Sequence, residues 1–185
     1  SAPVDIVSTV NFAINNPTST FNVTLGASAG AALTTASQAT LIGNEAGKAI
    51  TTPTANTAVG HQALLTNIVG TGNTAIGTSA MNKVTGNYNT AIGNFTGNAL
   101  TAAFSNTLLG DSAGNNLTTG SSNICIGLTS FASSPTVSNE ITLGGNSISA
   151  LRCNVTSISS LSDARDKTDI VDTAYGVDFL NTLQP

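Results

Sequence analysis

The chain has 185 residues, of which only 8% are charged and 4% are aromatic, and its net charge is −4. Because no basic cluster appears, the sequence excludes a protein that binds nucleic acid through its phosphates. The hydrophobic fraction of 40% excludes a disordered chain, and no apolar run reaches the roughly 18 residues of a membrane-spanning helix.

A regular repeat begins after residue 21, so we expect residues 1–21 to be an N-terminal connecting segment. The pentapeptide Asn-Thr-Ala-Ile-Gly occurs at 73–77 and again at 89–93. When the chain is aligned on the glycine that follows an aliphatic residue, the spacing is 17 residues, with one spacing of 16. These reference glycines are Gly26, Gly43, Gly60, Gly77, Gly93, Gly110, Gly127 and Gly144. The period predicts stacked coils, each of which repeats the fold of its neighbour.

Positions in each repeat are numbered here from the reference glycine. Position −1 is always Ile, Leu or Val, position +3 is always small, and position +7 is apolar in six of eight repeats. The residues before the glycine predict a short strand, which the glycine ends through a backbone angle that other residues resist. We expect a second extended piece around position +7, and a narrow core built from positions −1 and +7. Residues 22–151 therefore predict an all-β fold, a repetitive parallel β-roll or β-helix.

Asparagine occupies position −4 in six of eight repeats. The six are Asn22, Asn56, Asn73, Asn89, Asn106 and Asn123. Parallel stacking places these amides above one another, so they predict a ladder of hydrogen bonds.

Threonine occupies position −3 in five consecutive repeats, at Thr40, Thr57, Thr74, Thr90 and Thr107. A regular threonine array is typical of an ice-binding face, and an ice-binding solenoid would be a monomer with a flat threonine surface. This array is a single column that shares strand parity with position −1, so we expect it to point inward at the edge of the core.

Position −2 has the opposite parity, and we expect it to face away from the coil's own core. It carries Thr24, Leu41, Ala58, Ala75, Ala91, Leu108, Cys125 and Thr142. A continuous, weakly apolar stripe on a soluble rod indicates a partner surface. Identical rods that meet along such a stripe would form a closed symmetric oligomer.

The repeated Asn-Thr-Ala-Ile-Gly coils resemble those of phage tail fibres and of trimeric autotransporter adhesin heads. The resemblance spans about Asn22 to Leu151. It implies a homotrimer in which each chain winds a left-handed parallel β-roll, and a triple-stranded β-helix of interwoven chains is the alternative. It also implies an extracellular rod of a virion, with other tail proteins and a host-cell receptor as partners, or a bacterial trimeric surface adhesin.

The period stops after Leu151, and eight of the fourteen charged residues lie between Arg152 and Asp178, both included. We take residues 152–161 as a linker and residues 162–185 as a separate C-terminal segment. In this segment apolar residues recur at three-residue steps, which predicts a short helix. They are Ala174, Val177, Leu180 and Leu183.

The C-terminal segment resembles the start of the intramolecular chaperone domain of phage tail spikes, the endosialidase-type peptidase S74 family. The matching residues are Ser162, Asp163, Lys167, Thr168, Ile170, Asp178, Phe179, Leu180, Leu183 and Pro185. In that family the chaperone assists assembly of three chains and then cuts itself off. The resemblance implies Ser162 as nucleophile, Lys167 as the group that activates it, and cleavage of the Leu161–Ser162 bond. A single self-directed cut would not make the chain an enzyme toward other substrates, and the truncated domain is expected to be inactive.

The remaining candidate residues indicate no other chemistry. His61 is the only histidine, so one chain cannot build a Ser-His-Asp triad. Cys125 and Cys153 do not form a Cys-x-x-Cys pair, which argues against zinc. No cofactor motif, metal motif or membrane insertion is predicted.

Overall fold

The structure is a computed structural model that describes residues 13–16, 19–145, 147–150 and 152. The chain divides into two compact units, residues 1–149 and 150–185, and the fold given below is that of the first. Across the described ranges every element is a β-strand. None of the described residues belongs to a helix long and apolar enough to cross a membrane.

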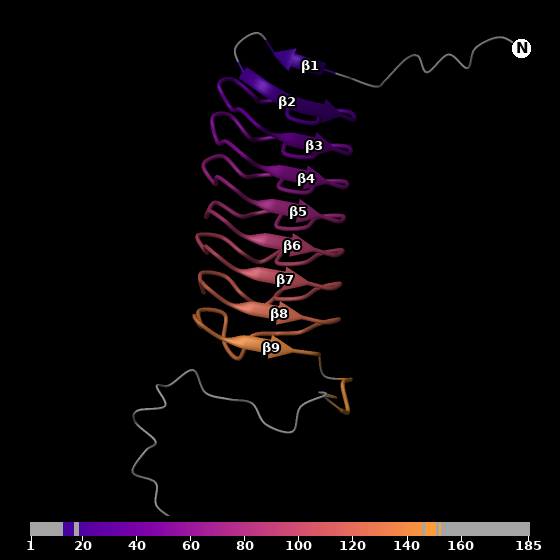
Figure 1. The fold of residues 1–185 in the computed structure, drawn as a ribbon, viewed down its shortest axis with the longest axis vertical. Coiled ribbons are helices and arrows are strands. Elements are labelled where there is room, and N and C mark those ends of the chain that lie inside the picture. The colour runs from indigo at the N-terminus through magenta and orange to yellow at the C-terminus, as the bar shows by residue number, and fades with distance from the viewer. Residues whose placement is uncertain (1–12, 17–18, 146, 151, 153–185) are drawn as a thin grey trace, which may run out of the picture. The chain divides into compact units, whose positions relative to one another are not determined.

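Nine strands form one sheet in chain order, and Figure 1 shows them stacked one above another. Strands β1 (Ala13–Asn16) and β2 (Ser19–Leu25) form an antiparallel hairpin at the N-terminal end. The parallel strands that follow are β3 (Thr40–Ile42), β4 (Thr57–Val59), β5 (Thr74–Ile76), β6 (Thr90–Ile92), β7 (Thr107–Leu109), β8 (Ile124–Ile126) and β9 (Ile141–Leu143). The all-β, parallel, repetitive fold is confirmed as a β-solenoid.

The strand register follows the sequence repeat. Thr57 pairs with Thr40 on one side and with Thr74 on the other, so equivalent positions of successive coils lie above one another. Every parallel strand pairs with the next coil of the same chain, whereas interwoven chains would alternate strands from different chains. The structure is therefore a roll of one chain.

Each coil turns at its reference glycine. Gly60 has a φ of 133°, and a Cβ at this residue would lie 2.6 Å from the carbonyl oxygen of Gly77 in the next coil. Both facts exclude a side chain, so the role predicted for the glycine is confirmed. The expected second extended piece is wrong, because Gln62 and Leu64 take left-handed φ values of 57° and 51° and the chain continues through turns.

The core contains position +7 but excludes position −1, so half of the predicted core is wrong. At position +7, Ile50, Val84, Leu100 and Leu117 are fully buried. At position −1 the side chains are exposed or half-buried, and Ile92 is 38% exposed. These eight side chains form an aliphatic stripe on the outside: Leu25, Ile42, Val59, Ile76, Ile92, Leu109, Ile126 and Leu143.

Position −2 lies inside the coil, so its expected role as an outward partner surface is also wrong. Leu41, Ala58, Ala75, Ala91 and Leu108 are all fully buried. The physical reason is the alternation of side chains along a strand. Asparagine at position −4 points inward, so position −2 points inward as well, and positions −3 and −1 point outward.

In four of the coils, inward side chains at positions −2 and +4 complement one another in size. Leu41 lies against Gly47, where a Cβ would come within 2.7 Å of the leucine Cδ2. In the next coil the sizes are reversed, because Ala58 is followed by a fully buried Leu64. Leu108 again lies against a glycine, Gly114. This exchange of large and small residues fills a narrow core with few side chains.

The asparagine ladder is confirmed, and its main partners are backbone groups. Asn56 Oδ1 accepts the N–H of Asn73 at 3.0 Å, and its Nδ2 donates to the carbonyl of Gly70 at 2.8 Å. The same two bonds recur at Asn22, Asn73, Asn89, Asn106 and Asn123. Three of the amides also donate to the asparagine of the preceding coil. Each side chain thus satisfies one buried donor and one buried acceptor of the next coil.

Substituting Ala39, which interrupts this ladder at position −4, should stabilise the solenoid. By the repeat register, Ala39→Asn would accept the N–H of Asn56 and donate to the carbonyl of Pro53. We expect the free energy of unfolding to rise by about 1 kcal/mol, measured by urea unfolding. Ala39→Val adds bulk at this buried site without an amide and should lower it. A loss of stability in Ala39→Asn would show that an asparagine at this position does not form the two hydrogen bonds that it forms in the other coils.

Candidate interaction surface

The outer face of the strands carries the aliphatic stripe next to the threonine column. Ile76 and Leu109 are 37% and 45% exposed, and Leu143 is 53% exposed. The five threonines at position −3 are half-buried or exposed and point the same way, so their expected inward direction is wrong. The face is therefore a narrow band of one threonine column and one aliphatic column, and within each column the residues repeat at the spacing of the strands, about 4.8 Å.

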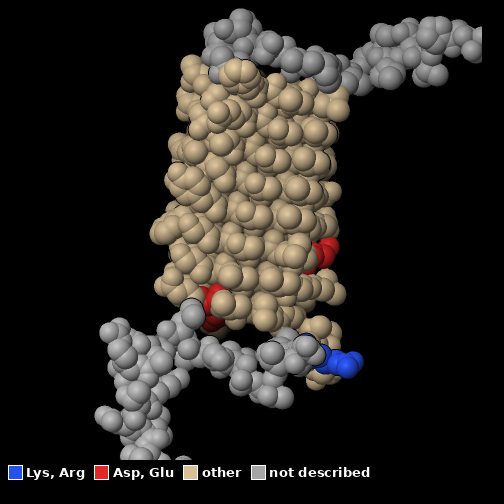
Figure 2. Space-filling view, in the orientation of Figure 1, with Lys and Arg blue, Asp and Glu red and all other residues tan. Residues whose placement is uncertain are grey.

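Charges are sparse on the solenoid. Residues 19–149 contain five charged side chains, Glu45, Lys48, Lys83, Asp111 and Glu140. The face of the coils that is drawn in Figure 2 is almost free of charged side chains. A surface with so little charge can associate with another protein surface at low electrostatic cost, because few like charges repel and few charges lose their hydration.

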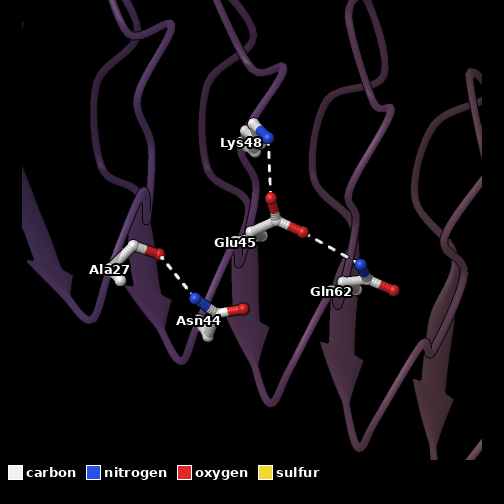
Figure 3. Close-up of polar contacts among 5 residues, drawn as sticks. All are labelled: Ala27, Asn44, Glu45, Lys48 and Gln62. Carbon is white, nitrogen blue, oxygen red and sulfur yellow. Dashed lines mark hydrogen bonds and ion pairs between the residues drawn. The ribbon is translucent and has the colours of Figure 1, made fainter.

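One polar cluster joins two neighbouring coils at the corner after the strands (Figure 3). Glu45 accepts from Lys48 Nζ at 2.6 Å and from Gln62 Nε2 at 2.9 Å. The hydrogen bond from Lys48 is the largest cause that lowers the pKa of Glu45. Beside it, Asn44 Nδ2 donates to the carbonyl of Ala27 at 3.4 Å. The one amine of the cluster, Lys48, is paired with Glu45, and no group of metal-binding side chains occurs among the described residues.

Glu140 replaces the asparagine at position −4 of the last coil. Its carboxylate accepts the hydroxyl of Ser133, the N–H of Ser133 at 2.8 Å and the hydroxyl of Thr142 at 3.3 Å. The Ser133 hydroxyl is the largest cause that lowers the pKa of Glu140 below 4.5. The carboxylate thus folds the loop of the last coil back onto its strand.

The C-terminal coil should lose stability in acid through Glu140. A carboxyl whose pKa is lowered in the folded state stabilises the fold fully above its unfolded pKa of 4.5, and this stability is lost as the pH falls through the folded pKa. We expect Glu140→Gln to be less stable than the wild type at neutral pH. The difference should shrink in thermal melts recorded below about pH 4.5. A difference that is independent of pH would contradict this role.

The residues predicted for self-cleavage cannot be placed. Ser162, Lys167 and the Leu161–Ser162 bond lie outside the described residues, as do Cys153 and the helix expected at 174–183. Of the other candidates, His61 is exposed at a corner, and Cys125 is buried at position −2, where burial raises the pKa of its thiol.

Sequence reasoning missed a group of large apolar side chains on the loops that precede the strands. Ile68, Val69, Tyr88 and Phe104 are 52%, 64%, 66% and 54% exposed. Apart from the single 16-residue coil that carries Tyr88, no periodic signal marks them, because each occupies a position that is polar or small in most other coils.

The chain was compared with family models, curated proteins and solved structures. No family model, no curated protein and no solved structure matches the chain.

Proposed function

We propose that the chain is a structural rod of a homotrimeric viral appendage, most simply a bacteriophage tail fibre, located outside the cell on the virion. In this proposal the coils wind left-handed, the rod spans distance, and it presents its surface to a host receptor. The observation that carries the proposal is the outward aliphatic stripe. A row of half-buried and exposed branched side chains along the whole solenoid favours burial against a partner.

Threefold association explains the stripe well. Three parallel rods that turn their strand faces to a common axis would bury the same residues of each chain, as a closed symmetric oligomer requires. The stripe would then stack in layers along the axis, with Ile76 and Ile92 near its middle. The flanking threonines can satisfy their hydroxyls at the rim of such an interface.

Absolute mass in solution, from light scattering on a sizing column, tests the trimer. Three chains of 18.4 kDa give about 55 kDa, from 3 × 18.4. A mass near 18.4 kDa would overturn the fibre proposal for this chain.

The outward threonine column specifically favours one second candidate, an ice-binding solenoid. Thr57, Thr74 and Thr90 pair directly across successive strands, so their side chains form a regular row. Ice binding requires this face to be free in a monomer. The mass measurement separates the two functions, and thermal hysteresis of a monomeric chain would support the second.

Residues 162–185 are proposed to be the start of the trimerisation chaperone, with Ser162 and Lys167 as a latent self-cleaving pair. Lysine can take the serine proton if burial lowers its pKa. We expect intact-mass spectrometry to find the Leu161–Ser162 bond uncut in this chain. If a cut product does accumulate on incubation, Ser162→Ala should abolish it. Cleavage that persists in Ser162→Ala would show that a contaminating protease is responsible.

A further inference from the structure

The loops that precede β5, β6 and β7 carry the exposed group of Ile68, Val69, Tyr88 and Phe104, called here the aromatic corner. The loop with Tyr88 belongs to the only 16-residue coil, which has one residue fewer between position +7 and the strand than its neighbours. In the alignment of the two coils, the single residue Thr85 therefore corresponds to the pair Ile68–Val69. The short coil thus carries one exposed ring, Tyr88, and the coil after it carries the other, Phe104.

Tyr88 occupies a turn whose left-handed backbone is set by the fold of the coil. Its φ is 59°, in the left-handed region that bulky residues rarely adopt. The same position takes a left-handed φ in every coil, with values of 66° at Phe21 and 62° at Asn139, so the turn belongs to the repeat and Tyr88 occupies it with a bulky side chain. Left-handed backbone costs a bulky residue on the order of 1 kcal/mol, so glycine or asparagine would be the more stable choice at this position.

The tyrosine ring is also oriented by its neighbour. A Cβ on Gly72 would lie 2.7 Å from the Tyr88 Cδ1, so the ring packs over the glycine while 66% of the residue stays exposed. The N–H of Tyr88 donates to the carbonyl of Thr71 at 3.0 Å, which anchors the loop to the preceding coil. A ring that is already oriented loses little entropy when it binds a ligand.

Phe104 lies next to Tyr88 in the following coil. The N–H of Ser105 donates to the carbonyl of Asn87 at 3.1 Å, so the segments Asn87–Tyr88 and Phe104–Ser105 run side by side. The N–H of Phe104 is held by the hydroxyl of Ser121 at 3.1 Å. Two exposed rings thus stand on adjacent coils with backbones fixed by hydrogen bonds.

The surroundings of the rings are neutral and rich in hydroxyl groups. The segments 51–55, 68–72, 85–88, 101–105 and 118–122 line this side of the coils, and none contains a charged residue. Thr71, Asn87 and Ser105 supply polar groups beside the rings. Single-stranded nucleic acid also stacks on aromatic rings, but it requires a basic groove, which is lacking here.

From this geometry we infer that the aromatic corner binds a neutral carbohydrate. The apolar C–H face of a hexose would stack on the rings of Tyr88 and Phe104, and its hydroxyl groups would exchange hydrogen bonds with the adjacent threonine, asparagine and serine groups. This inference goes beyond the proposed function, because one chain contains the whole corner and the strand face remains free for association.

The test is affinity electrophoresis of the full chain in gels that contain mannan, galactan, dextran or soluble chitin oligomers, with hyaluronate as the anionic probe. The variants are Tyr88→Asn and Phe104→Ser, each of which introduces a residue that the same position carries in another coil. The matched control is Phe95→Ser, which removes a ring that is 45% exposed at position +2, a position that is serine in three other coils.

We expect retardation by at least one neutral polysaccharide, an affinity about tenfold lower in Tyr88→Asn, and unchanged affinity in Phe95→Ser. The unfolding free energy of Tyr88→Asn should equal or exceed that of the wild type, because asparagine tolerates the left-handed backbone. The inference is overturned by binding to none of the neutral probes, by binding to hyaluronate alone, or by equal binding of Tyr88→Asn. The mass of each sample separates this result from the trimer, since a monomer that binds would contradict only the proposed function.

Discussion

Asn89→Ala is expected to lower the free energy of unfolding by about 3 kcal/mol. Asn89 is fully buried, and its Oδ1 accepts the N–H of Asn106 at 3.1 Å while its Nδ2 donates to the carbonyl of Ala103 at 2.9 Å. The amide also donates to Asn73 Oδ1 at 3.1 Å. Alanine would leave the N–H of Asn106 and the carbonyl of Ala103 buried without a partner, and each unsatisfied group costs roughly 1–3 kcal/mol.

Asn94→Ala is the matched control for this prediction. Asn94 is exposed in the same coil, and its Nδ2 donates to the Asp111 carboxylate at 3.2 Å. We expect a change within about 0.5 kcal/mol, as for most surface substitutions. Urea unfolding of both variants gives the comparison. Equal and small losses would mean that water enters the ladder readily, which would contradict its structural role.

The position of Asn89 in the middle of the stack should also change the shape of the unfolding transition. In a solenoid each coil contacts only its neighbours, so stability is roughly a sum of coil and interface contributions. A weakened central coil lets the two halves of the solenoid unfold separately. The m-value of Asn89→Ala should therefore be lower than that of the wild type, while that of Asn94→Ala should not change.

The repeat could be predicted from the sequence because its columns reflect close approach of equivalent backbones. Gly60 faces Gly77 where no side chain fits, and Asn56 holds the backbone of the next coil. Such requirements recur in every coil and therefore leave a periodic signal. The length of the period and the parallel register follow from that signal alone.

Hydrophobicity alone predicts the inside and the outside of the strand in reverse, because position −1 is aliphatic in every coil and position −2 is not. However, the alternation along the strand that buries the asparagine at position −4 turns the aliphatic residue at position −1 outward. The informative signal was the exchange between positions −2 and +4, where Leu41 goes with Gly47 and Ala58 with Leu64. Residues that compensate in volume must touch, which places position −2 inside.

The aromatic corner could not be predicted because it breaks the repeat. Tyr88 and Phe104 each replace a residue that is small or polar in most other coils, and a single departure has no periodic signal. Only the backbone shows that Tyr88 sits in a left-handed turn and packs over Gly72. Sequence columns report what all coils share, whereas binding residues belong to one or two coils.

A charged pair in the aliphatic stripe should dissociate the proposed trimer. The side chains of Ile76 and Ile92 are 37% and 38% exposed and point away from the coil's core. In the double variant Ile76→Lys, Ile92→Lys the single chain can therefore keep its fold. In a trimer the variant would place six unpaired ammonium groups near one axis, and each would cost several kcal/mol to desolvate. We expect the mass to fall from about 55 kDa, from 3 × 18.4, to 18.4 kDa.

The control adds the same charge elsewhere on the solenoid. Ala31→Lys with Thr66→Lys places lysine at positions +5 and +6, which Lys48 and Lys83 occupy in the following coils. Both sites are exposed, so this variant should keep the trimer mass. Circular dichroism of both variants shows whether the β-solenoid survives. If the stripe variant stays folded and remains at the trimer mass, the strand face is not the interface, and the chains must associate through another side of the coils.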